Sequence, residues 1–157
     1  MVSLLVRNLL FTILYPGIVA GLIPYWMVLE RSEIPPLDEL TIHHYAGLAA
    51  FIIGLVILIT CILSFAVQGQ GTLSPLDPTR RLVTKGLYKF SRNPMYVGVM
   101  LILTGEALAA LSSDLGYYAI IIFVFFNLFI LLHEEPRLRR VFGEEYTAYC
   151  HQVRRWI

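Results

Sequence analysis

Two short polar motifs carry the residues of this chain whose types and spacing could do chemistry. One is the basic turn at 92–96, Arg-Asn-Pro-Met-Tyr, which comes shortly after Gly86 and Tyr88 and opens a long apolar run. The other is the carboxylate pair Glu134 and Glu135, which directly follows a second apolar run. A guanidinium binds carboxylates in a fork, and a carboxylate binds an ammonium through a charge-assisted hydrogen bond. Both motifs are therefore candidates for binding the charged groups of a ligand.

The basic turn also predicts local structure. Pro94 disfavours a helical conformation at Asn93 and is well suited to the first position of a helix. Backbone N–H groups at that helix start lack partners within the helix and can bind an anionic group beside the guanidinium of Arg92. Arg92 is therefore the candidate catalytic residue. The alternative is an ordinary basic turn at a membrane surface.

Glu134 and Glu135 lie where an apolar helix is expected to meet water. A carboxylate is costly to bury at such a place, so the pair indicates a functional site. The alternative is an interfacial pair that water solvates, or that Arg137 and Arg139 neutralise.

Three other residues whose side chains could take part in binding or catalysis lie within or beside apolar runs. Glu106 must face the interior of a helical bundle or a wet cavity. There it either belongs to a substrate pocket or pairs with Asn127 or a hydroxyl. His43 and His44 are adjacent on an expected helix and should point to different faces, which argues against a metal site.

The elements that must position these motifs are apolar helices. The chain has 157 residues and is 57% hydrophobic and only 15% charged, which is more apolar than a soluble domain of this size sustains. Its apolar residues gather in four blocks, at 9–29, 42–67, 95–111 and 116–132. A bilayer core needs about 20 apolar residues in a helix, and the last two blocks fit if those helices are short or the membrane is thin. We therefore predict a single domain over 1–157 with four transmembrane helices; the first block is too long for a secretory signal.

The positions of the charges predict a topology. Basic residues predominate in the loop at 68–94 and in the tail after residue 132, whereas the loop at 30–41 is acidic. Basic loops stay on the cytoplasmic side. With four helices, this rule places both termini in the cytoplasm. The formal net charge of +1 argues against nucleic acid as a partner, and the two cysteines show neither a disulfide framework nor a metal-binding spacing.

Several local signals add detail to the helices. Pro16 and Pro24 predict a kink in the first helix. Ser113 and Asp114 should cap or turn the outer end between the last two spans. In the tail, apolar residues recur every three or four positions from 138 to 153 and predict an amphipathic helix, which lies on the membrane face or folds back over the basic loop. A small-residue face for close helix packing is formed by Gly47, Ala49, Ala50 and Gly54.

The spacing of the Gly-x-Tyr at 86–88, the turn at 92–96 and the Glu pair resembles the integral-membrane methyltransferases. The closest patterns are those of the isoprenylcysteine carboxyl methyltransferases and the phospholipid N-methyltransferases. The resemblance covers about residues 72–157, the expected cofactor-binding half. Those families usually show Arg-His-Pro-x-Tyr, and Asn93 stands here for the His. The resemblance implies methyl transfer from S-adenosyl-L-methionine to a lipophilic acceptor, by an all-α membrane bundle of about four transmembrane helices with a C-terminal amphipathic helix.

The resemblance also implies roles for individual residues. Glu134 matches the carboxylate that contacts the cofactor, and the segment before the Gly-x-Tyr matches the lining of the nucleoside pocket. Glu106 is the candidate substrate residue because of its place within an apolar run, and not because of the resemblance. The residues implied to bind the cofactor are Arg80, Arg81, Leu82, Val83, Tyr88, Asn93, Pro94, Met95, Tyr96, Glu134 and Glu135.

The chain departs from the family pattern at one position, and two alternative functions stay open. The prenylcysteine enzymes carry an arginine one helical turn before the first Glu, where this chain has Ile130, so a prenylcysteine carboxylate is disfavoured against an amine, a thiol or another lipid nucleophile. The first alternative function is an NADPH-dependent membrane reductase, in which Arg80, Arg81 and Arg92 serve a 2′-phosphate. The second is a non-catalytic lipid-binding membrane protein. The expected partners are the bilayer and the lipophilic acceptor, without nucleic acid or metal.

Overall fold

The computed structural model describes residues 16–29, 40–64, 67 and 81–157. Within these residues the chain is all-helical, as predicted. In chain order the elements are the π-helical turn η1 (Ile18–Leu22), the helices α2 (Ile23–Leu29) and α3 (Ile42–Ser64), the 3₁₀ turn η4 (Gly86–Lys89), the helices α4 (Pro94–Ala109) and α5 (Ser113–Phe129), the π-helical turn η5 (Ile130–Glu134) and the helix α6 (Glu135–Gln152).

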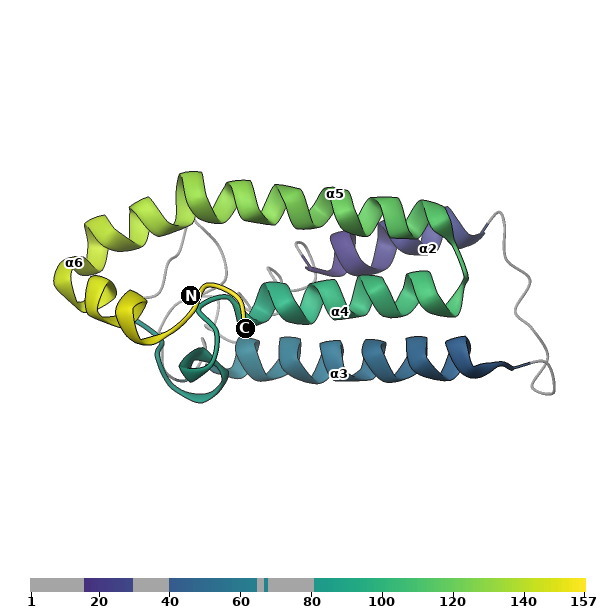
Figure 1. The fold of residues 1–157 in the computed structure, drawn as a ribbon, viewed down its shortest axis with the longest axis horizontal. Coiled ribbons are helices and arrows are strands. Elements are labelled where there is room, and N and C mark those ends of the chain that lie inside the picture. Colours follow the sequence, from purple (N-terminus) through teal and green to yellow (C-terminus); the bar gives the residue numbers. More distant parts are fainter. Residues whose placement is uncertain (1–15, 30–39, 65–66, 68–80) are drawn as a thin grey trace, which may run out of the picture.

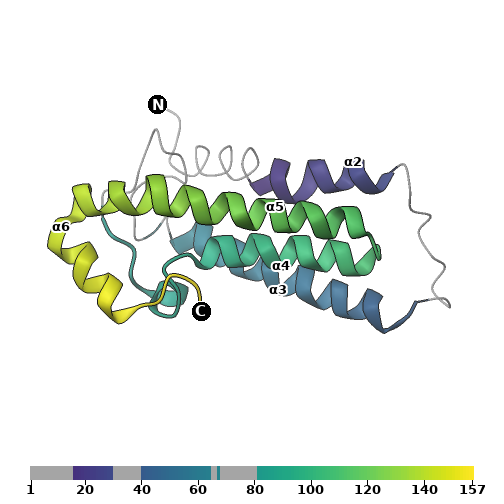
Figure 2. The ribbon, with the colours of Figure 1, turned by 45° about the horizontal axis from the view of Figure 1, so that its top comes forward.

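The helices α3, α4 and α5 run along the long axis of the molecule (Figure 1). The short helix α2 lies beside α5, and α6 continues from α5, bends and returns toward the bundle (Figure 2). The C-terminus comes back to the beginning of α4. One end of the bundle therefore brings together the start of α4, the junction of α5 with α6, and the end of the chain.

The pair α3 and α4 is packed backbone against backbone. A Cβ atom on Gly54 would stand 2.6 Å from the carbonyl oxygen of Gly98, and one on Gly47 would stand 2.6 Å from that of Gly105. No side chain fits at these distances, so only glycines permit this approach. The prediction of a small-residue face is confirmed for Gly47 and Gly54 and is wrong for Ala49, which is exposed.

Apolar residues fill the space where the helices meet and also cover the outside of the bundle. The core consists of Ala20, Leu58, Val99, Ile102, Leu103, Ala119 and Phe126. The outward faces of α3 and α5 expose Leu48, Ile52, Ile53, Leu55, Val56, Ile59, Ile120, Ile121, Val124, Phe125 and Leu128. Contiguous apolar surface of this extent suits contact with lipid.

Two of the described helices are long and apolar enough to cross a membrane, namely Ile42–Ser64 and the helix that begins at Ser113. Two shorter apolar helices, Ile18–Val28 and Pro94–Ala109, accompany them. The first expected span is described only from residue 16 onward. Its predicted kink is confirmed, because Ala20 has the non-helical angles φ −110° and ψ 17°.

The turn between α4 and α5 begins one residue earlier than predicted. Ser112 has extended backbone angles, and its Oγ accepts a hydrogen bond from the N–H of Leu115 at 3.3 Å. Ser112 is therefore the residue that caps α5. The prediction that Ser113 and Asp114 form this turn is wrong, since both already belong to the first turn of α5.

The helix α6 folds back over the basic loop, which decides between the two predicted placements. Its direction changes at Gly143, whose φ of 53° is unusual for any residue with a side chain. Beyond this bend, Tyr146, Tyr149 and Val153 are buried against Leu82, Leu138 and Phe142. The hydroxyl of Tyr149 donates a hydrogen bond to the carbonyl oxygen of Tyr88 at 2.6 Å.

Candidate functional site

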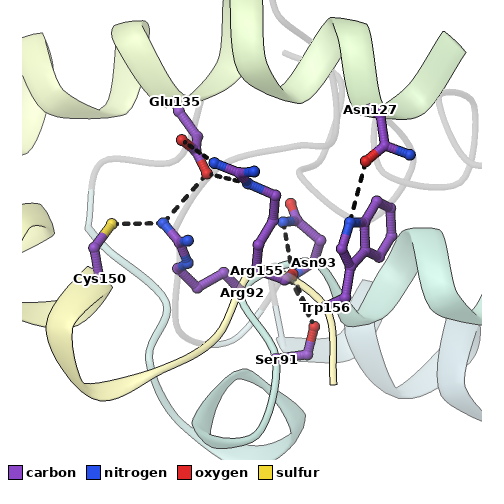
Figure 3. Close-up of polar contacts among 8 residues, drawn as sticks. All are labelled: Ser91, Arg92, Asn93, Asn127, Glu135, Cys150, Arg155 and Trp156. Atoms are coloured by element: carbon purple, nitrogen blue, oxygen red, sulfur yellow. Dashed lines mark hydrogen bonds and ion pairs between the residues drawn. The ribbon is translucent and has the colours of Figure 1, made fainter. Parts of the chain in front are cut away.

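A cluster of polar side chains lies where α4 begins, and Figure 3 shows eight of its residues. The predicted start of a helix at Pro94 is confirmed, and Asn93 before it has the non-helical angles φ −128° and ψ 48°. Asn93 is buried, and its backbone N–H donates to the Oγ of Ser91 at 3.1 Å. The turn therefore closes on itself and holds Arg92 at the mouth of α4.

Glu134 faces α4 across this end of the bundle. The hydroxyl of Tyr96 donates a hydrogen bond to its Oε2 at 2.8 Å, and the ring of Tyr96 lies against that of Phe126 with centroids 4.6 Å apart. Burial raises the pKa of the Glu134 carboxyl, and the Tyr96 hydrogen bond and the charge of Arg137 offset part of that rise. Within the described residues Tyr96 is its one hydrogen-bond partner. Glu134 is thus a carboxylate that an added cation would stabilise.

Glu135 is engaged differently from its neighbour. It is only 7% exposed. The guanidinium of Arg155 bonds to both of its oxygens, Nε to Oε1 at 2.8 Å and NH2 to Oε2 at 3.0 Å. Arg92 NH1 lies 3.2 Å from Oε1. Burial acts to raise the pKa of Glu135, but the hydrogen bonds and charge of Arg155, together with the charge of Arg92, hold it below its ordinary value. Glu135 is thus an ionised member of an internal ion cluster.

Arg92 is only partly satisfied by its neighbours. Its NH1 contacts Glu135 and donates to the Sγ of Cys150 at 2.7 Å. Its Nε is buried and has no hydrogen-bond partner among the described residues. A buried N–H without an acceptor is costly, so an incoming anion would be stabilised there.

The end of the chain contributes contacts that the sequence reasoning missed. The backbone N–H of Arg92 donates to the carbonyl oxygen of Arg154 at 2.9 Å. The carbonyl oxygen of Arg155 accepts from Asn93 Nδ2 at 3.0 Å and from Ser91 Oγ at 3.3 Å. The only signal of these residues in the sequence was their positive charge, which was used to predict the membrane topology and not the site.

The other residues implied to bind the cofactor differ in their surroundings. Val83 and Tyr88 are buried against Cys61 of α3, with Met95 packed beside them. Leu82 packs under α6, whereas Arg81 is exposed. Arg80 lies outside the described residues.

Glu106 lies apart from this site. It is three helical turns beyond Pro94 on α4, or about 18 Å along the axis at 1.5 Å per residue. Its Oε2 is buried without a hydrogen-bond partner in the described part of the chain. The alternative of a pair with Asn127 is wrong, because Asn127 bonds to the carbonyl oxygen of Phe123 and to the indole of Trp156.

The two adjacent histidines are not on different faces as expected. The rings of His43 and His44 have centroids 4.1 Å apart, and both bond to the hydroxyl of Thr41. Among the described residues no group of three or more His, Cys, Asp or Glu is placed to hold a metal ion.

The helical fold, the exposed apolar surface of the bundle and the cluster of charged residues at one of its ends indicate a small membrane protein. Comparison with known sequences names the family. The sequence pattern of the phospholipid methyltransferases matches residues 42–145, so the chain belongs to the phospholipid methyltransferase family. It is also similar to an uncharacterized protein of Haemophilus influenzae, with 39% identity over 64 residues, which are 40% of this chain and 100% of that protein. No solved structure matches.

Proposed function

We propose that the chain transfers a methyl group from S-adenosyl-L-methionine to a lipophilic acceptor. One observation carries this proposal. The same end of the bundle holds the carboxylate of Glu134, which has one hydrogen-bond partner among the described residues, and the guanidinium of Arg92, whose buried Nε–H has none there. The amino-acid part of the proposed cofactor has one ammonium and one carboxylate, which are the complements of these two groups.

The residues at this end fit such a ligand. Glu134 would accept hydrogen bonds from the ammonium, and the Nε–H of Arg92 would donate to the carboxylate. Val83 and Tyr88 lie on the buried side of the loop that leads into the turn and are proposed for the nucleoside part. Arg92, the candidate catalytic residue, then acts by holding the ligand.

The chemistry asks little of the protein beyond alignment. S-adenosyl-L-methionine supplies a methyl group on a sulfonium, which leaves as a neutral thioether. The chain must therefore hold its ligands in line and exclude water. Burial of Tyr146 and Tyr149 of α6, and of Val153 after it, against Leu82 of the basic loop supports a site that is closed on that side.

The membrane arrangement proposed with this function has four spans and both termini in the cytoplasm. The site end of the described structure carries Arg92, Arg137, Arg139, Arg140 and Arg155, the sign of charge that stays cytoplasmic. Reporter fusions at each terminus test this arrangement. A C-terminal tag that is accessible only from outside would contradict it.

The acceptor is proposed to be a lipid other than a prenylcysteine. Ile130 is fully buried and begins η5, so it supplies no cation for a substrate carboxylate. A carboxylate without a partner is strongly disfavoured in an apolar pocket. We expect a methyl-labelled donor to mark a component of a native lipid extract and to leave a farnesylcysteine analogue unmarked. Robust labelling of the analogue would contradict this proposal and favour a prenylcysteine as the acceptor.

Binding of the cofactor is the direct test of the proposal. Calorimetry on the purified protein should detect S-adenosyl-L-methionine and not NADPH. Glu134→Gln should weaken the binding by about 1.5–3 kcal/mol, or roughly tenfold or more, because it removes a charge-assisted hydrogen bond. Glu144→Gln is the matched control, since Glu144 is exposed on α6. An unchanged dissociation constant in folded Glu134→Gln, or binding of NADPH in place of the methyl donor, would contradict the proposal.

A further inference from the structure

The last residues of the chain, 153–157, run back across the site. The helix α6 ends at Gln152, and Val153 is extended, with φ −126° and ψ 134°. Figure 1 shows the C-terminus at the beginning of α4, and Figure 3 shows the same segment between Glu135 and Asn127. Residues 153–157 are called the C-terminal strap below.

The backbone of the strap holds the basic turn. Carbonyl oxygens of Arg154 and Arg155 accept three hydrogen bonds, from the N–H of Arg92, the hydroxyl of Ser91 and the side-chain amide of Asn93. These donors are consecutive residues immediately before α4. The strap therefore fixes the segment from which the Arg92 side chain extends.

The side chain of Trp156 fastens the strap to α5. Its indole N–H donates to Asn127 Oδ1 at 3.2 Å, and its ring lies against that of Phe123 with centroids 5.3 Å apart. The strap is thus held at both sides, by the residues before α4 and by the C-terminal half of α5.

The side chains of Arg155 and Arg92 compete for the carboxylate of Glu135. The cluster of Arg92, Arg155 and Glu135 contains two positive charges and one negative charge. Because Arg155 occupies both oxygens of Glu135, Arg92 reaches that carboxylate through Nη1, and its Nε–H has no acceptor in the part of the chain that the structure describes. Without Arg155, Glu135 would neutralise Arg92 by itself, and a bidentate pair of the two would compete with any other anion.

We propose that the C-terminal strap is part of the ligand site and that Arg155 is a positioning residue, which occupies Glu135 so that Arg92 stays available for the carboxylate of the ligand. The proposal rests on the proposed function for the identity of that ligand. It assigns Arg155 no contact with the ligand.

The first experiment compares substitutions at Arg155 by calorimetry with S-adenosyl-L-methionine. We expect Arg155→Gln to raise the dissociation constant at least tenfold. Arg155→Lys keeps the charge and one contact with Glu135, and it should recover at least threefold of that loss. Arg140→Gln is the matched control, because Arg140 is exposed and, among the described residues, its hydrogen bond goes to the carbonyl oxygen of Pro136 in its own helix. It should stay within twofold of the wild type.

The outcomes separate the strap from the proposed function. Tight binding by the wild type with an unchanged constant in Arg155→Gln overturns the role of Arg155 and leaves the function standing. Equal losses in Arg155→Gln and Arg155→Lys also overturn it, since the conservative variant should rescue a positioning role. If the wild type itself does not bind, the proposed function and the ligand role assigned to Arg155 both fail.

A second experiment measures the strap without any ligand. Hydrogen exchange at the backbone N–H of Arg92 and alkylation of Cys150, which Arg92 contacts, report on the turn. In a chain that ends at Gln152, both should proceed at least tenfold faster than in the full chain. The buried Cys61 is the internal reference for alkylation and should stay protected. Unchanged exchange and alkylation in the shortened chain would overturn the claim that the strap holds the turn.

Discussion

The helix α4 is held by two regions that differ in kind. Along its length, Gly98 and Gly105 meet the glycines of α3 at distances that leave no room for a side chain. At its start, Asn93 and the residues before it donate hydrogen bonds to carbonyl oxygens at the end of the chain, next to a cluster of charges. The first region depends on shape and the second on electrostatics.

The two regions also differ in how far their groups are satisfied by contacts within the protein. The glycine seam between α3 and α4 is complete, since every position in it is filled by backbone and apolar side chains. The charged end retains an unused Arg92 Nε–H and a Glu134 with one hydrogen-bond partner among the described residues. A binding site needs hydrogen-bonding groups that are available to a ligand, and the rigid seam beside this site keeps them in place.

The largest effect is expected from breaking the seam. Gly54→Val should lower the free energy of unfolding by about 3 kcal/mol, the upper end of the range for overpacking. The two atoms nearest to the added side chain are backbone atoms, which cannot rotate away. Thermal unfolding in detergent measures the loss. Gly116→Ala is the control, since nothing lies within 4 Å of a Cβ there. A Gly54→Val protein as stable as the control would mean that the two helices are not in close contact.

A smaller, pH-dependent effect is expected at the charged end. Glu135 has a lowered pKa in the folded protein. Its contribution to stability is therefore fully present above the ordinary glutamate value of about 4.3 and is lost as the pH falls through the lowered folded-state value. Glu135→Gln should be less stable than the wild type at neutral pH by about 2–3 kcal/mol, because it leaves two guanidiniums without their carboxylate.

Melting temperatures between pH 3 and pH 7 measure this prediction. The difference between wild type and Glu135→Gln should shrink as the pH falls below the ordinary glutamate value. A constant difference over the whole range would show that the ion cluster does not carry the effect. The seam variant Gly54→Val should show no such convergence, which distinguishes the two regions directly.

The smallest effect is expected from Tyr96→Phe, which removes one hydrogen bond from Glu134. Affinity for S-adenosyl-L-methionine should fall by about 1 kcal/mol, or roughly fivefold. Burial raises the pKa of Glu134 and the Tyr96 hydrogen bond opposes that rise, so the variant should have a higher pKa still. The deficit should accordingly be larger at pH 6.5 than at pH 8.5. Tyr117→Phe, at an exposed position of α5, is the control. A deficit that does not change with pH would argue against an ionised Glu134 as the binding group.

The sequence predicted the parts of the fold that depend on composition and local backbone chemistry. Apolar runs located the helices, Pro94 located the start of α4, and the prolines of the first run predicted the kink that the structure has at Ala20. The cap at Ser112 was missed by one residue, because Ser112 and Ser113 carry the same side chain and only the backbone angles decide between them.

The structure brings the predicted residues Arg92, Asn93, Glu134 and Glu135 to one end of the bundle, but the sequence predicted neither Arg155 nor the contacts among these residues. The pairing of Arg155 with Glu135 depends on the bend at Gly143 and on an extended return from Val153. Neither the bend nor the return has a periodic signature. The different partners of Glu134 and Glu135 could not be predicted for another reason. Two adjacent residues of one type differ only in the direction in which the helix points their side chains.

That direction is set by the π-helical turn η5, in which the N–H of Glu135 bonds to the carbonyl oxygen of Ile130. Such a turn contains one residue more than an α-helical turn, and the helix after it keeps the orientation that it would have without the extra residue. In genetic terms, loss of the single codon for Glu134 would convert η5 into an ordinary turn and leave Glu135 facing its arginines. Three nucleotides thus separate a chain with both carboxylates from one that keeps the scaffold and loses the proposed ligand contact.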